Sequence, residues 1–418
     1  MPFHSSHFSF LFQKAMAKKR SASPSLRHSL WLVISISSFL FIFAILRLQY
    51  QPRHLPSARR PIVPFVGTPK IAFLFLARNN LPLDFLWQSF FQSADEDKFS
   101  VYIHSRPGFV FDESSTKCTF FYGRQLSKSV EVSWGESSMI KAEQLLLEVA
   151  LQDHANQRFV LISDSCVPMY NFSYIYNYVM SSSKSFVDSF LDTKEGRYNP
   201  KMSPTIPKAK WRKGSQWITL VRRHAEIVVD DDLVFPIFNR YCKRRPPLNL
   251  DGKLNHRKIV QKEHNCIPDE HYMQTLLAMC DLEDELERRT LTYTEWNQSA
   301  TKMEGQAWHP ITFKYSNASP QRINKIKGIN HIYYETEYRT EWCQSNGTSV
   351  PCFLFARKFS RGAAMRLLSA AVPYHWANAY YPNLYNHQSK WSCKSEIDVT
   401  GSQNSELLLE LVSDEAGV

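Results

Sequence analysis

Residues 70–77 read KIAFLFLA, a short apolar run of the kind that forms strands. Two runs of the same kind follow, FSVYIH at residues 99–104 and RFVLISDS at residues 158–165. Before the third run, residues 137–151 carry apolar side chains at helical spacing. Because strands alternate with helical sequence, we predict an α/β domain with a largely parallel sheet.

Polar side chains follow each of these runs. They are Arg78 and Asn79 after the first run, His104 at the end of the second, and Asp164 with Cys166 after the third. Ligands of such sheets bind at the carboxyl ends of the strands. We therefore expect the functional site to lie among these residues.

Upstream of the first run, residues 30–46 form the uncharged apolar stretch LWLVISISSFLFIFAIL, near the lower length limit for a transmembrane helix. A cleaved signal peptide, and hence a secreted protein, is the alternative. However, the leader before the stretch is long, and no cleavage site of small residues follows it. We predict an uncleaved signal-anchor over residues 30–46, behind a cytoplasmic tail over residues 1–29.

The rest of the chain divides by composition. Residues 47–68 are rich in proline and arginine without apolar periodicity, which predicts a stem. The α/β domain is expected over residues 69–385, followed by a polar and acidic tail over residues 386–418.

Cysteines and glycosylation sequons indicate the compartment. All eight cysteines lie after the anchor, and so do four N-x-S/T sequons, which begin at Asn171, Asn297, Asn317 and Asn346. This distribution predicts a luminal domain. In a lumen, the formal net charge of +11 favours anionic small molecules such as nucleotide sugars over nucleic acid.

Eight cysteines allow too many pairings for the sequence to choose among them. Only Cys343 and Cys352, which close a short turn, form an evident local pair. We predict a disulfide between them.

Several kinds of catalytic motif are missing. The sequence has no P-loop, no G-x-G-x-x-G and no G-x-S-x-G nucleophile motif. The acids at residues 95–97 and 230–232 match D-x-D, but neither group follows a predicted strand, so we interpret both as solvated loop acids. Arginine or lysine can neutralise a leaving diphosphate instead of a metal ion. Arg339, Arg357 and Lys358 are the candidates.

Two adjacent acids, Asp269 and Glu270, stand in the stretch NCIPDEHYMQTLL, just before an apolar run at helical spacing. An acid in a first turn can cap the helix. On a helical wheel, however, both acids project to the same half as the apolar stripe, and an inward acid needs a partner or a function. Periodicity does not choose between these interpretations, because a capping residue does not follow the wheel.

A set of motifs resembles the core-2/I-branching β-1,6-N-acetylglucosaminyltransferases, most closely their plant branch, and is similar to xylosyltransferases. The motifs run from about residue 69 to about residue 365 in the order of that family. They are KIAFLFLARNNLPLDFLWQSFF, VYIH, VSWGESSMIKAE, FVLISDSCVPMYNF, WRKGSQW, CIPDEHYMQT, TEWNQSATKMEGQAWHP and NGTSVPCFLFARKFS.

The resemblance implies a GT-A glycosyltransferase domain, with a Rossmann-like mixed sheet and flanking helices, in a single-pass type II Golgi membrane protein. It implies an inverting, metal-independent reaction without a cofactor. Glu270 would be the catalytic base that takes the proton of the acceptor hydroxyl, leaving Asp269 to cap the helix. His104 would bind the uridine nucleotide, Trp296 the acceptor, and Arg339 with Lys358 the diphosphate.

One departure concerns the donor. Animal members of the family carry aspartate two residues before the proline of the third motif, where this sequence has Cys166 before Pro168. Either Asp164 takes over this donor contact or the contact is lost. We therefore expect transfer of N-acetylglucosamine from a UDP-sugar to a glycan or glycoprotein, with a glucuronosyl or xylosyl donor as the alternative. A non-catalytic Golgi glycan-binding protein is the second alternative.

Three sequons are expected to carry glycans, at Asn171, Asn317 and Asn346. The fourth, at Asn297, is expected to stay unused because it adjoins the proposed acceptor residue Trp296.

Overall fold

The computed structural model describes residues 31–42, 65–244, 265–296, 310–345 and 347–371. A helix covers residues 31–42. Within these described ranges, no helix is both long and apolar enough to cross a membrane. The predicted anchor extends on both sides beyond the described helix, and the predicted cytoplasmic and acidic tails lie outside the described residues.

A six-stranded mixed sheet organises the domain, in the order β2 (Phe99–His104), β1 (Lys70–Leu76), β3 (Asn156–Ser163), β6 (Thr219–Val221), β5 (Ser185–Phe186) and β7 (Leu286–Glu287). Strand β1 is parallel to both β2 and β3, whereas β6 is antiparallel to β3 and β5. The three strands predicted from apolar runs are therefore confirmed. Parallel pairing recurs at the other edge, between β5 and β7, so only the two pairings made by β6 are antiparallel.

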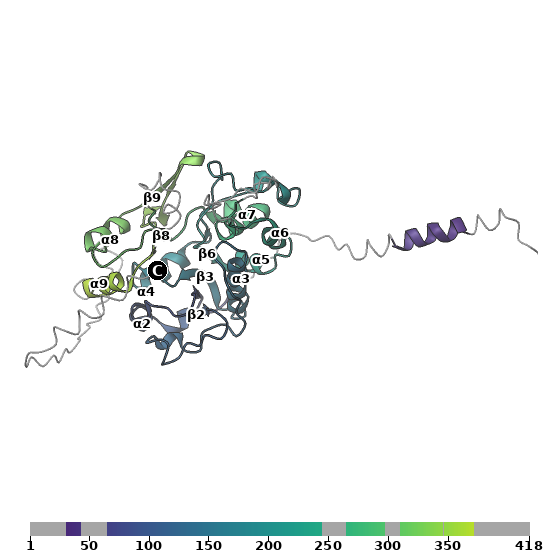
Figure 1. The fold of residues 1–418 in the computed structure, drawn as a ribbon. Helices are drawn as coiled ribbons and strands as arrows, with labels where there is room; N and C mark the ends of the chain where they lie inside the picture. Colours follow the sequence, from purple (N-terminus) through teal and green to yellow (C-terminus); the bar gives the residue numbers. More distant parts are fainter. Residues whose placement is uncertain (1–30, 43–64, 245–264, 297–309, 346, 372–418) are drawn as a thin grey trace, which may run out of the picture. The chain divides into compact units, whose positions relative to one another are not determined.

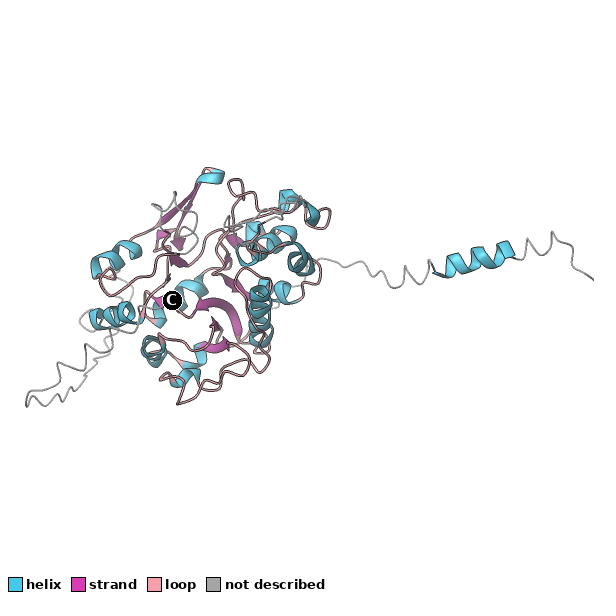
Figure 2. Cartoon of the chain, in the orientation of Figure 1, coloured by secondary structure: helices cyan, strands magenta, loops and turns pink. Residues whose placement is uncertain are grey.

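The central strand β1 is buried on both faces, which explains its uninterrupted apolar sequence. Phe73 and Phe75 belong to one core with the helices α2 (Asp84–Gln92) and α4 (Phe172–Ser181). Ala72 and Leu74 belong to a second core with α3 (Ser138–Ala150), α5 (Arg222–Val229), α6 (Val234–Tyr241) and α7 (Tyr272–Met279). Figure 1 shows α2 and α4 on one side of the sheet and α3 and α5 on the other. Figure 2 shows the same layering by secondary structure.

Smaller sheets complete the domain. Strand β13 (Phe355–Arg357) pairs antiparallel with β4 (Val167–Pro168) and parallel with β8 (Thr292–Thr294), which brings the segment after residue 355 beside the end of β3. Strands β9 (His331–Tyr334) and β10 (Arg339–Trp342) form a hairpin, joined through the short helix η8 (Glu335–Glu337). The remaining strands and α-helices of the described chain are β11 (Gln344–Ser345), β12 (Thr348–Ser349), α8 (Pro320–Lys327) and α9 (Arg361–Ala371).

The described part of the chain contains two disulfides. The predicted pair Cys343–Cys352 is confirmed, and a second disulfide joins Cys242 to Cys266, 24 residues apart. Sequence spacing did not indicate this second pair, because its two ends meet only after α6 and η5 (Pro268–Glu270) have packed.

Two of the predicted glycosylation sites lie in the described chain. Asn171 is the N-cap of α4, where its side chain accepts a hydrogen bond from the Tyr174 amide at 2.9 Å. Asn317 accepts a similar bond from the Lys314 amide at 2.6 Å, and both asparagines are half-buried. Asn297 and Asn346 lie outside the described residues.

The two D-x-D candidates have different environments. The acids at residues 95–97 are exposed, as predicted. The interpretation of residues 230–232 as solvated is wrong for Asp231, which is 8% exposed and accepts hydrogen bonds from the amides of Leu233, Val234 and Phe235 at the start of α6. Asp231 is therefore a structural helix cap.

Candidate active site

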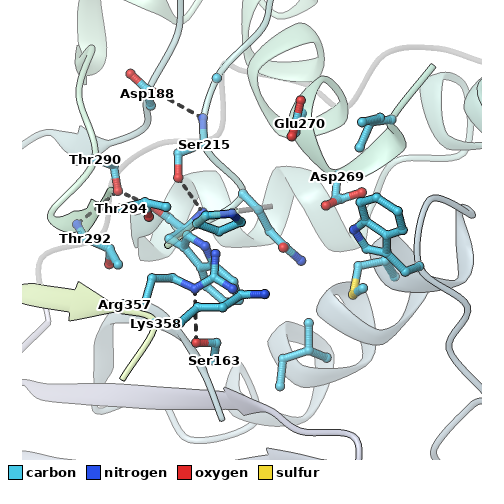
Figure 3. Close-up of a pocket in the computed structure, with 18 of the residues that line it drawn as sticks. Ser163, Asp188, Ser215, Asp269, Glu270, Thr290, Thr292, Thr294, Arg357 and Lys358 are labelled. Atoms are coloured by element: carbon cyan, nitrogen blue, oxygen red, sulfur yellow. Dashed lines mark hydrogen bonds between the residues drawn. The ribbon is translucent and has the colours of Figure 1, made fainter. Parts of the chain in front are cut away.

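A cavity of about 1570 Å³ opens at the carboxyl ends of the parallel strands. The strands are in register there, since Leu76 pairs with both His104 and Ser163, and all three residues line the cavity. This is the edge at which the sequence predicted a site. Figure 3 shows the acids Asp269 and Glu270 on one side of the pocket and the cations Arg357 and Lys358 on another.

His104 ends β2 and is 1% exposed. Its Nε2 accepts a hydrogen bond from the Val130 amide at 3.1 Å, so the ring proton resides on Nδ1. Burial lowers the pKa of His104 to about 4. The imidazole is therefore neutral at physiological pH and serves as a polar, uncharged part of the cavity wall.

Arg357 ends β13, Lys358 follows it, and both residues line the cavity. The Arg357 Nε donates to Ser163 Oγ at 3.3 Å, and its guanidinium lies 4.4 Å from the centre of the Trp217 ring. Burial lowers the pKa of Arg357 to about 10, while Asp164 acts in the opposite direction. Burial, and then Arg357, lower the pKa of Lys358. Two adjacent, partly desolvated cations would stabilise an anionic ligand.

Arg339 is positioned differently from Lys358. Its side chain donates to Glu337 at 2.8 Å, to Glu341 and to the Ser189 carbonyl at 3.1 Å, and it is absent from the cavity lining. The structure thus brings Arg357, rather than Arg339, beside Lys358.

Glu270 ends the short helix η5 (Pro268–Glu270) and lines the cavity. Its Oε2 accepts from Arg197 Nη1 at 2.7 Å and lies 4.0 Å from Lys213 Nζ. The Glu270 carbonyl also accepts from the Gly214 amide at 2.9 Å. Both ends of the residue are therefore fixed, while the side chain remains 22% exposed.

Close packing of the backbone at position 214 leaves room only for glycine. A Cβ atom at this position would lie 1.7 Å from the Asp188 carbonyl oxygen. The close approach lets the 213–215 segment pass between Asp188 and Glu270.

The prediction that Asp269 caps the helix is wrong. Helix α7 begins at Tyr272 and has no side-chain cap, because a turn of 3₁₀ helix separates the acids from it. Asp269 is instead 7% exposed, lines the cavity and has an Oδ1 without a hydrogen-bond partner in the described chain. Burial, and then Glu270, raise its pKa to about 7.

A further buried acid lies nearby. Glu143 on α3 accepts from Gln216 Nε2 at 2.7 Å, and burial raises its pKa to about 8, with Asp269 adding to the effect. Glu143 lies in the motif VSWGESSMIKAE and Gln216 in the motif WRKGSQW. The sequence alone assigned no role to either motif.

Sequence reasoning also missed Arg197, Lys213 and Asp188. Lys213 follows directly on the motif residues Trp211 and Arg212, so the WRKGSQW motif was a usable signal. Arg197 stands in a stretch without a motif, and only the fold brings it to Glu270.

Two other predicted residues line the cavity. Trp296 is 49% exposed and forms a backbone bridge with Pro310, at the two ends of a segment outside the described residues. Asp164 follows β3 and lies close enough to influence the pKa of both Arg357 and Lys358. Over the described ranges, no group of three or more His, Cys, Asp or Glu side chains is arranged to hold a metal ion.

The sequence matches the model of the family described as Core-2/I-Branching enzyme over residues 71–327. It is 55% identical over 309 residues to "Glycosyltransferase BC10" of Oryza sativa subsp. japonica, covering 73% of this chain and 77% of that protein. The solved structure of an active-site mutant of LgtC aligns with 8% identity and a TM-score of 0.33, over 72% of this chain and 95% of that one. A complex of galactosyltransferase LgtC with donor and acceptor sugar analogues gives 8% identity and a TM-score of 0.33, over 68% and 86%.

Proposed function

This chain belongs to the Core-2/I-branching enzyme family and is a glycosyltransferase, and we propose that it transfers N-acetylglucosamine from a UDP-sugar to a glycan in a β-1,6 linkage. The reaction is inverting and needs no metal ion, in a domain of the GT-A type. One observation carries the proposal: a carboxylate held by cations, Glu270, shares a cavity with the cation pair Arg357 and Lys358.

Glu270 is the general base. Arg197 holds Oε2 with a charge-assisted hydrogen bond, while Oε1 makes no hydrogen bond with the described part of the chain. Oε1 accepts the proton of the acceptor hydroxyl as its oxygen attacks the anomeric carbon of the donor. The bond from that carbon to the diphosphate breaks in the same displacement, and its electron pair leaves with UDP. A single displacement inverts the configuration of the sugar.

Arg357 and Lys358 stabilise the leaving diphosphate. They lie beside the ends of β1 and β3, where ligands of α/β sheets bind. Their partial burial strengthens their attraction for phosphate oxygens because less water screens the charges. The neutral His104 borders the same part of the cavity and contacts the uridine nucleotide, and Asp164 contributes the remaining donor contact.

Trp296 binds the acceptor. Its half-exposed ring lines the cavity and offers a flat apolar face to the acceptor sugar. A β-1,6 linkage requires an acceptor with a free primary hydroxyl.

The enzyme is a single-pass type II membrane protein of the Golgi with a luminal catalytic domain. Two disulfides in the described chain support an oxidising compartment for this domain.

Donor profiling tests the proposal. The full-length chain is incubated with UDP-GlcNAc, UDP-xylose or UDP-glucuronic acid and with a β-galactoside that carries a free primary hydroxyl. We expect consumption of UDP-GlcNAc and a product with a β-anomeric proton by NMR. Transfer from UDP-xylose or UDP-glucuronic acid would show that the proposed donor is wrong. An α-linked product would contradict the inverting mechanism. Failure to consume any of the three donors, with UDP binding intact, would favour a glycan-binding protein.

A further inference from the structure

The hairpin of β9 and β10 packs on the segment that carries Arg197, the partner of Glu270. We call residues 187–197 the strap. The strap leaves β5, passes along the cavity and ends at Arg197, which is half-buried. The strap therefore positions the Arg197 guanidinium beside the Glu270 carboxylate.

The contact between hairpin and strap is centred on Tyr334 and Asp188. The Tyr334 hydroxyl donates to Asp188 Oδ1 at 2.5 Å, and the Ser215 amide donates to Asp188 Oδ2 at 2.9 Å. Tyr334 and Asp188 both line the cavity. The half-buried Asp188 carboxylate thus joins the hairpin to the segment whose Gly214 amide donates to the Glu270 carbonyl.

Arg339 reinforces this contact from the second strand of the hairpin. Its guanidinium lies 4.2 Å from the centre of the Tyr334 ring and donates to the Ser189 carbonyl at 3.1 Å. Glu337, which pairs with Arg339, accepts from the Leu191 amide at 3.1 Å. The hairpin therefore holds three consecutive parts of the strap, at residues 188, 189 and 191.

The far end of the strap is held by its own ion pairs. Glu195 pairs with both Arg197 and Lys213, and Asp192 accepts from the Arg197 amide at 2.9 Å. Phe190 and Lys213 exchange two backbone hydrogen bonds of 2.8 Å. A displacement of the strap at Asp188 would be transmitted along this short, bonded segment to Arg197.

We propose that the β9–β10 hairpin positions the catalytic base, with Tyr334 and Arg339 acting through Asp188 and the strap to hold Arg197 against Glu270. Arg339 is thus a positioning residue rather than a diphosphate ligand. This inference rests on the proposed role of Glu270 and adds two residues that need not touch the reacting atoms.

Tyr334→Phe tests the inference because it removes the hydroxyl and keeps the ring. The full-length variant is assayed with whichever of the three UDP-sugars the wild type consumes, and UDP affinity is measured by calorimetry. Loss of one hydrogen bond to a charged group predicts a fall in kcat of about ten-fold, with UDP affinity unchanged. Tyr333→Phe is the matched control, since Tyr333 faces the other side of the hairpin and is 57% exposed, and it should keep wild-type kcat.

A double-mutant cycle separates positioning from a direct contact with substrate. In an Arg197→Gln background, Tyr334→Phe should change kcat by less than about two-fold, because the residue through which it acts is gone. Arg339→Lys should behave in the same way, and it provides the test if Tyr334→Phe fails to bind UDP.

Two results would overturn the inference: wild-type kcat in both single variants, or a full ten-fold effect that persists without Arg197. Glu270→Gln is assayed alongside them. If Glu270→Gln is inactive while the hairpin variants are normal, only the inference fails. If Glu270→Gln itself turns over normally, the proposed function fails.

Discussion

The Glu270 carboxylate lies 2.7 Å from the Arg197 guanidinium, although 73 residues separate the two along the chain. This pair fixes one carboxylate oxygen, Oε2, while Oε1 makes no hydrogen bond within the described chain. A carboxylate in this state can accept a proton without first losing a hydrogen bond at the accepting oxygen. The pair is therefore the geometric basis for assigning general-base catalysis to Glu270.

Lys358→Ala should weaken UDP binding. Removing a charge-assisted contact to phosphate predicts a loss of about 1.5–3 kcal/mol in binding free energy, measured by calorimetry with UDP. Arg339→Lys should leave the UDP affinity unchanged, because Arg339 is bonded to Glu337, Glu341 and Ser189. Equal losses of UDP affinity in the two variants would show that Arg339 binds the diphosphate, as the family resemblance implied.

Transfer should survive chelation. If Arg357 and Lys358 neutralise the diphosphate, the initial rate in EDTA should remain within about two-fold of the untreated rate, since no metal has to be lost. The rate is followed by the release of UDP. Complete loss in EDTA with recovery on addition of manganese would contradict the metal-free reaction.

Gly214→Ala should damage both stability and turnover. The new methyl group would lie 1.7 Å from the Asp188 carbonyl oxygen, so the backbone must move, at a predicted cost of about 3 kcal/mol in the free energy of unfolding. Denaturant titration measures this cost. Gly362→Ala on α9 is the control, because the nearest atom to its Cβ is at 3.6 Å. Similar unfolding midpoints for the two variants would show that residue 214 is not tightly packed.

Asp269→Asn should change how stability depends on pH. The pKa of Asp269 is raised to about 7 in the fold from its ordinary value of 3.8, so the folded state keeps a proton that the unfolded state loses. This contribution to stability is complete below pH 3.8 and is lost as the pH rises towards 7. An asparagine cannot lose that proton.

The difference in unfolding free energy between Asp269→Asn and wild type should therefore shift in favour of the variant between pH 4 and pH 7, and then level off. Chemical denaturation at several pH values measures the difference. A difference that is constant with pH would show that Asp269 is ionised in the fold like an ordinary aspartate.

The sequence predicted those parts of the structure that depend on residues close together in the chain. The runs that form β1, β2 and β3 are recognisable because their strands lie in the buried half of the sheet, and Cys343–Cys352 because its loop is short. Of the residues to which the family resemblance assigns a role, His104, Asp164, Glu270, Trp296 and Lys358 line the cavity.

Residues whose role depends on tertiary contacts were not recognisable. Arg197 reaches Glu270 only through the strap. Arg339 and Arg357 lie on different strands, β10 and β13, and of the two only Arg357 lines the cavity. The environment of Asp269 depends on a 3₁₀ turn that an apolar pattern does not distinguish from the first turn of α7. In each case the deciding quantity is a distance between segments that are remote in sequence.

The most direct test of the account is kcat for Glu270→Gln, measured on a verified donor and acceptor together with UDP affinity. Glutamine keeps the shape of the side chain but cannot accept the proton, so kcat should fall by roughly 10²–10⁴-fold while UDP affinity is unchanged. Glu148→Gln, the same substitution at an exposed position of α3, should keep wild-type kcat. Normal turnover by Glu270→Gln would contradict the assignment of the catalytic base.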